Sequence, residues 1–115
     1  NDTTRVKNLF CSGVDHQRSM RFTEDALAPN TTNNYLAFTI PSWMVPSSTV
    51  DVPVYVSKDN SNVTGLAVIS GKGTSGEGSV RLYPSTDGSN GSWTQDSNGT
   101  GRGMTARACI NYSVQ

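Results

Sequence analysis

The chain has 115 residues, and its nine basic and nine acidic residues cancel to a formal net charge of zero. This length predicts one domain over residues 1–115, and the neutral charge argues against binding to nucleic acid or an anionic membrane, which requires a basic surface. No apolar run approaches the ~18 residues of a membrane-spanning helix, so no membrane insertion is expected.

The predicted elements are strands, because apolar residues alternate with polar ones and no segment keeps the 3.6-residue period of a helix. Residues 5–14 and 18–23 predict two weakly patterned strands at the start of the chain. A clearer strand is predicted over residues 34–40. Leu36, Phe38 and Ile40 are expected on one of its faces and Tyr35, Ala37 and Thr39 on the other.

A stiff corner is predicted at residues 41–46, a segment that begins and ends with proline. Trp43 lies inside this segment and is expected in the core or in a contact between subunits. The next strand is predicted over residues 50–56, with all four of its valines on one face. Pro53 lies within it and has no N–H to donate, which places this strand at the edge of a sheet.

Three further segments complete the predicted strands and turns. A polar turn over residues 58–62 leads into the continuous apolar run of residues 63–70, which is long enough for a buried strand. Residues 79–83 predict a short strand with Val80 and Leu82 inward and Arg81 and Tyr83 outward. The longest alternating stretch is residues 104–114. Its inner face is expected to hold Met104, Ala106, Ala108, Ile110, Tyr112 and Val114.

Short strands separated by turn residues are typical of an all-β fold, so the chain is expected to form a single antiparallel β-sandwich or jelly roll. Leu, Ile, Val and Phe number only 22, which predicts a thin core. Nine of the eleven glycines lie between Gly71 and Gly103 and predict a long Gly-rich loop region. Residues 84–103 within it exceed the ~12–15 residues beyond which loops are commonly functional.

The two cysteines, Cys11 and Cys109, lie near opposite ends of the chain. Such a pair in a Ser-, Thr- and Asn-rich chain favours a disulfide and an oxidising compartment. A bridge that closes so long a loop would stabilise the fold by ~4–5 kcal/mol. Alternation along the last strand places Cys109 on the polar face, however. The bond would therefore need a bulge, or would join neighbouring strands on the outer surface; two free thiols are the alternative.

No catalytic residue, metal site or cofactor is predicted. His16 is the only histidine, and Asp15 beside it would point to the opposite side of a strand, where it cannot orient the imidazole. Two cysteines and one histidine in scattered places do not form a metal-binding pattern. Residues 71–76 match Gly-x-Gly-x-x-Gly, but a strand follows instead of a helix, so a simple strand connection is expected.

A ligand-binding site is predicted instead around Trp93, in the middle of the long polar loop. The flat indole would cover the C–H face of a pyranose while amides and carboxylates bond the sugar hydroxyls. The other residues expected in the site are Asp87, Asn90, Gln95 and Asp96 in the loop, Arg81 and Tyr83 on the strand before it, and Arg102 at its end. The alternative is that Trp93 folds back and caps the thin core.

An apolar strand ending in Ile-Pro, a Pro-Ser corner and a second alternating strand follow one another in residues 35–41, 45–47 and 52–56. Together with the paired-strand rhythm of residues 65–69 and 79–83, this succession resembles the receptor-binding heads of phage tail fibres, and pilus-tip adhesin heads look similar. The resemblance implies a jelly-roll sandwich, commonly a trimer. It carries no site residue over to this chain.

The sequence therefore predicts a non-enzymatic adhesin or receptor-binding head, secreted or displayed on a cell or virion surface, whose partner is a cell-surface glycan. A homo-oligomer, with a trimer favoured, would add burial to the thin core. The main alternative is a structural pilus or capsid-decoration subunit that binds only its own assembly. A small secreted hydrolase that uses His16 is a third reading.

Overall fold

The computed structural model describes residues 9–22, 26–27, 35–58, 61–84, 103–104 and 108–115. Strands dominate this part of the chain, and one turn of 3-10 helix, η1, follows the fourth strand. The elements are β1 (Leu9–Val14), β2 (Gln17–Phe22), β3 (Ala26–Leu27), β4 (Leu36–Thr39), η1 (Ser42–Met44), β5 (Val50–Lys58), β6 (Ser61–Ile69), β7 (Ser79–Tyr83), β8 (Gly103–Met104) and β9 (Ile110–Ser113).

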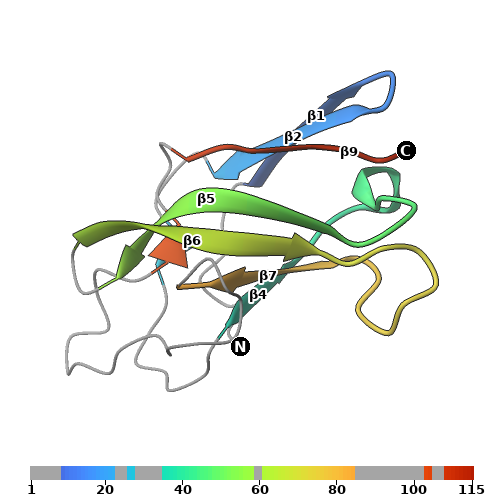
Figure 1. Cartoon of the computed structure of the whole chain (residues 1–115). Coiled ribbons are helices and arrows are strands. Elements are labelled where there is room, and N and C mark those ends of the chain that lie inside the picture. The colour runs from blue at the N-terminus through green and yellow to red at the C-terminus, as the bar shows by residue number, and fades with distance from the viewer. Residues whose placement is uncertain (1–8, 23–25, 28–34, 59–60, 85–102, 105–107) are drawn as a thin grey trace.

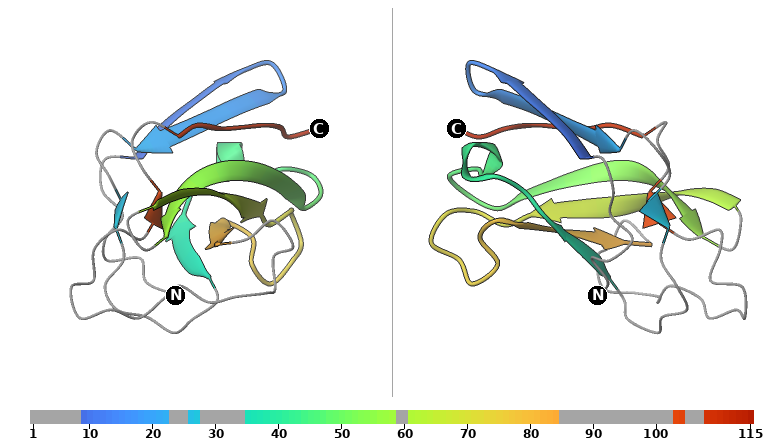
Figure 2. Two further views of the ribbon diagram at one scale, coloured as in Figure 1. Left: turned by 60° about the vertical axis from the view of Figure 1, so that its left-hand side comes forward. Right: turned by 180° about the vertical axis from the view of Figure 1, so that it is seen from behind.

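Two antiparallel sheets pack against each other as separate layers (Figure 1). One has three strands in the order β1-β2-β9, and the other has six in the order β3-β8-β5-β6-β7-β4. Figure 2 shows the same two layers in two further views; in the view from behind, η1 lies beside the carboxyl-terminal end of the chain. The predicted all-β sandwich is therefore confirmed, whereas its jelly-roll connectivity stays a prediction.

The six-stranded sheet is built around the long hairpin of β5 and β6. Strand β7 pairs with β6, and β4 pairs with β7 at the outer end. Among the described residues, the other side of β5 is paired only at Ser57, with Gly103 of β8. Most of β5 thus lies at an edge, as the missing N–H of Pro53 predicts.

The core lies between the two sheets and follows the predicted alternation. Phe22 of β2 and Phe38 of β4 meet across it edge-on, with ring centroids 5.1 Å apart and planes at 71°. The other buried apolar side chains come from both layers and from the corner at η1: Met20, Leu36, Ile40, Met44, Val45, Val54, Val56, Ala67, Ile69, Val80, Leu82, Met104, Ala108, Ile110 and Tyr112.

One prediction about packing is wrong, and of the two positions expected for Trp43 the core is excluded while a contact between subunits stays a prediction. The stretch from residue 104 to 114 is not one strand, because Met104 belongs to β8 in the six-stranded sheet and residues 110–113 form β9 in the other. Of its predicted inward residues, Met104 enters the core from β8, and Ile110 and Tyr112 enter it from β9; Ala108 is also buried, Val114 is partly buried, and Ala106 lies outside the described residues. Trp43 is not a core residue either: it is 48% exposed, because η1 turns it outward and buries Met44 instead.

The structure also corrects the predicted disulfide, because Cys11 and Cys109 are free thiols. Cys11 is in register with Met20, and Met20 with Ile110, so β2 lies between the two cysteine-bearing segments. Two strand spacings come to about 10 Å, beyond the ~6.8 Å that a disulfide spans between Cα atoms. Cys11 also shares the inner face with Met20, whereas Cys109 is exposed.

Tyr112 ties the three-stranded sheet to the corner at η1. Its buried hydroxyl donates a 2.6 Å hydrogen bond to the carbonyl of Met44. Burial raises the pKa of Tyr112 to about 12, with a further rise from Cys11 and an opposing effect of Arg18. Because the folded state holds this proton more tightly than the unfolded chain, the resulting stability is fully present below about pH 10 and is lost between pH 10 and 12.

Tyr112→Phe is expected to lower the free energy of unfolding by about 1–3 kcal/mol at pH 7, because it leaves the Met44 carbonyl buried without a donor. Urea titrations of both proteins from pH 7 to pH 12 measure this difference. It should shrink as the pH rises from 10 to 12, since the phenol that titrates is present in the wild type alone. A difference that stays constant over that range would rule out Tyr112 as the titrating group.

Candidate functional site

The outer face of the six-stranded sheet, turned away from the three-stranded sheet, carries the candidate site. Alternation along β7 buries Val80 and Leu82 and turns Arg81 and Tyr83 outward, as predicted. The pairing of β4 with β7 aligns Arg81 with Ala37. One residue before β4, Tyr35 continues this register and reaches Tyr83, although residues 35 and 83 are far apart in sequence.

Tyr35, Arg81 and Tyr83 form a contiguous group, the tyrosine–arginine cluster. The guanidinium carbon of Arg81 lies 4.3 Å from the centroid of the Tyr35 ring, a close cation–π contact. The Tyr35 and Tyr83 rings are 5.9 Å apart at an interplanar angle of 53°. Arg81 is exposed and both tyrosines are half-buried, so the cluster presents ring surface and a cation together.

The outer face extends beyond the cluster across two more strands. Tyr83 is in register with Leu66 of β6, and Leu66 with Pro53 of β5. Next to this row, Tyr55 is 65% exposed and borders a shallow depression of about 130 Å³ that Pro53 and Thr64 also line. The face is therefore a broad, mostly uncharged platform with aromatic side chains at both ends.

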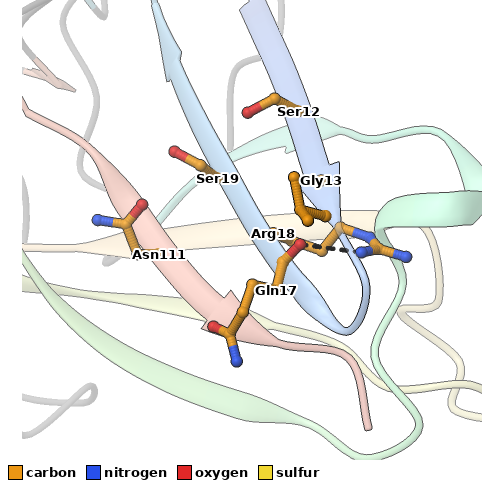
Figure 3. A pocket seen from close by; sticks show the side chains of 7 residues that line it. Ser12, Gly13, Gln17, Arg18, Ser19 and Asn111 are labelled. Atoms are coloured by element: carbon orange, nitrogen blue, oxygen red, sulfur yellow. Dashed lines mark hydrogen bonds between the residues drawn. The ribbon is translucent and has the colours of Figure 1, made fainter.

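A second candidate surface lies on the three-stranded sheet, where a cleft of about 200 Å³ is lined by polar side chains. Ser12, Ser19 and Asn111 come from β1, β2 and β9 at one level of the register. Figure 3 shows these three side chains on one side of the sheet, with Gln17 below them. The lining of this cleft includes no aromatic ring on which a sugar could stack.

The only charged residue in the lining, Arg18, has a structural role. Its Nη1 donates to the carbonyls of Asp15 and Gln17 at 2.7 and 2.9 Å, and its Nε donates to the carbonyl of Trp43 at 2.8 Å. The guanidinium also lies over the Trp43 ring, 5.7 Å from its centroid. Arg18 thus joins the β1–β2 hairpin to η1, and its Nε and Nη1 donors are used within the protein.

The loop with the Gly-x-Gly-x-x-Gly pattern, residues 71–78, joins β6 to β7 as predicted. Gly73 and Gly78 have φ angles of +83° and +87°, which favour glycine. The N–H of Gly73 donates a 2.7 Å hydrogen bond to the carboxylate of Glu77. A carboxylate of the loop thus takes a donor that a phosphate cradle would need, and nothing in the loop supports a phosphate site.

Of the predicted site residues, the structure brings Arg81 and Tyr83 together. The others, Asp87, Asn90, Trp93, Gln95, Asp96 and Arg102, lie outside the described residues. Tyr35 was not predicted for the site. Its outward position was visible in the alternation of residues 34–40, but its contact with β7 depends on the pairing of β4 with β7, which the sequence does not reveal.

In the part of the chain that the structure describes, three or more His, Cys, Asp or Glu side chains nowhere gather as metal ligands would. The described residues also include no helix long and apolar enough to span a membrane. Comparisons of the chain with protein-family models, with curated proteins and with solved structures gave no match. Its function has to be inferred from the chemistry of its own surface.

Proposed function

We propose that the domain is a receptor-binding, adhesin-like head that recognises a cell-surface carbohydrate through the outer face of the six-stranded sheet. The observation that carries this proposal is the tyrosine–arginine cluster. Two neighbouring phenol rings and a guanidinium lie together on the outer face of the sheet. The alternation of a strand requires polar side chains at such outward positions, but it does not require aromatic ones. The proposal includes an exported or virion-surface location and no enzymatic activity.

The chemistry of the cluster suits a sugar. The C–H bonds on one face of a pyranose pack against aromatic rings, and phenol hydroxyls and guanidinium N–H groups bond the ring substituents. The tilt of 53° between Tyr35 and Tyr83 gives two differently oriented surfaces on which a ring can rest. The chain then runs from Tyr83 through Pro84 into the sequence that contains Trp93, which is proposed as a further stacking residue.

Truncation of the cluster tests the proposal. Tyr83→Ala and Tyr35→Ala are each expected to weaken binding to the preferred glycan on an array by at least about tenfold, or ~1.4 kcal/mol, because each removes a stacking surface. Phe10→Ala is the matched control, since Phe10 is an exposed aromatic residue on the other sheet. Unchanged affinity in both tyrosine variants would refute this site, and unchanged affinity in Trp93→Ala would remove Trp93 from it.

A structural subunit that binds only its own assembly is the second candidate, and strand β1 favours it. β1 lies at the end of its sheet, and the described residues provide no partner for its other side. Its sequence, Leu-Phe-Cys-Ser-Gly-Val, has no charge or proline to block edge pairing. Phe10 and Val14 are 52% and 75% exposed. Light scattering separates the two candidates, because this one requires assembly that grows with concentration and no glycan binding.

We propose a trimer for the glycan-binding form, since contacts between subunits would supplement a core built from few apolar side chains. The exposed Trp43, packed against Arg18, is one surface that such contacts would cover. A trimeric mass in solution together with glycan binding is the combination that this form predicts.

A further inference from the structure

Among the described residues, no acceptor bonds the guanidinium N–H groups of Arg81. Its side chain makes a cation–π contact with Tyr35, with the guanidinium carbon 4.3 Å from the ring centroid, and none of the described residues forms an ion pair with the guanidinium. A cation–π contact supplies no hydrogen-bond acceptor, so it leaves the guanidinium N–H groups able to donate to a ligand. Arg18, by contrast, donates to three carbonyl oxygens.

Among the described side chains, no carboxylate adjoins the charge of Arg81 either. Asp51 is the other charged residue among the described side chains of this face, and the register places Val68 between Asp51 and Arg81. Two strand spacings separate Asp51 and Arg81 by about 10 Å, more than the ~8 Å screening length at physiological salt. An anion bound at Arg81 therefore meets one cation and no adjacent carboxylate of the described chain.

We infer that the sugar recognised at the tyrosine–arginine cluster carries a carboxylate, as uronic and sialic acids do. This inference rests on the proposed function and names the class of ligand. The planar fork of a guanidinium matches the two oxygens of a carboxylate and bonds both at once. Tyr35 holds the guanidinium plane in place, which reduces the side-chain freedom lost on binding. Tyr83 supplies the second ring against which the sugar packs.

A carboxylate fits better than a sulfate or phosphate. Recognition of phosphate and sulfate esters commonly uses several basic side chains together, and Arg81 is the one cation among the described side chains of the outer face. The zero net charge of the whole chain is consistent with electrostatic recognition of the ligand through a single ion pair, that between Arg81 and the carboxylate.

The experiment uses the full chain and matched pairs of oligosaccharides that end in glucuronic, galacturonic or sialic acid, each beside its methyl ester. The ester keeps the sugar ring and replaces the charged carboxylate with a neutral group that is larger by one methyl. One acid is expected to bind about 10- to 100-fold more tightly than its ester. Arg81→Gln should abolish this preference, and Arg81→Lys should keep part of it, because an ammonium retains the charge without the fork.

Arg21→Gln is the matched control, because Arg21 also lies over an aromatic ring, that of Phe10, at 5.8 Å on the other sheet. It should leave the preference for the acid unchanged. If acid and ester bind equally well and Tyr83→Ala abolishes the binding of both, the inference that the sugar carries a carboxylate is refuted, whereas the proposed function is supported. Tighter binding of a sulfated counterpart would also overturn it. Binding of no sugar in any arm would overturn both.

Discussion

Phe38→Ala is expected to lower the free energy of unfolding by about 3–5 kcal/mol. Phe38 is only 1% exposed, and its ring meets Phe22 edge-on at 5.1 Å across the interface of the two sheets. The substitution removes the ring, its contact with Phe22 and the packing of both layers around it. Domains of this size are stable by roughly 5–15 kcal/mol, so the loss is a large fraction of the total.

Urea denaturation of the two proteins measures the effect, and Phe10→Ala provides the control. Phe10 is 52% exposed on the outer face of β1, so its truncation should change stability by less than about 1 kcal/mol. Equal losses in the two variants would mean that the sheets do not pack through Phe22 and Phe38. The position of the core, and with it the identity of the outer face, would then be wrong.

Gly65→Ala is expected to cost about 1–3 kcal/mol of stability and to weaken glycan binding at the same time. A Cβ at this position would collide with the carbonyl oxygen of Tyr83 and lie 2.9 Å from a methyl group of Val56. The carbonyl belongs to the backbone at the end of β7, so it can move only if the strand moves. Tyr83 would move with it, and Tyr83 is part of the tyrosine–arginine cluster.

Gly76→Ala is the matched control for Gly65→Ala. A Cβ at residue 76 would meet the hydroxyl of Ser70 at 2.7 Å, and a serine hydroxyl can rotate away at little cost. Denaturant titration and glycan binding should therefore both stay close to wild type in this variant. A Gly65→Ala protein with wild-type stability and affinity would contradict the close approach of β7 to β6 and its role in placing Tyr83.

Alternation was enough to predict which way most strands face. In β7, the pattern of Val80 and Leu82 against Arg81 and Tyr83 gives the inner and outer residues correctly, because a strand has a side-chain period of two. The same argument gives the inner face of β4. The orientation of two of the predicted site residues was thus available from the sequence before any pairing was known.

The partners of each strand could not be predicted in this way, because pairing depends on contacts between distant segments. The disulfide failed for that reason: β2 intervenes between Cys11 and the segment that holds Cys109. The continuous alternation from Met104 to Val114 conceals a passage from one sheet to the other. Tyr35 was missed as a site residue because its proximity to Tyr83 exists only once β4 lies beside β7.

The central claim is that a carboxylated sugar binds on the outer face of the six-stranded sheet. Chemical-shift mapping tests it most directly: the ¹⁵N-labelled full chain is titrated with the acidic oligosaccharide that binds most tightly, and each backbone amide is followed. The account predicts that the amides of Tyr35, Arg81 and Tyr83 shift and saturate together. Shifts confined to Ser12, Ser19 and Asn111, with β4 and β7 unchanged, would place the ligand in the polar cleft and contradict it.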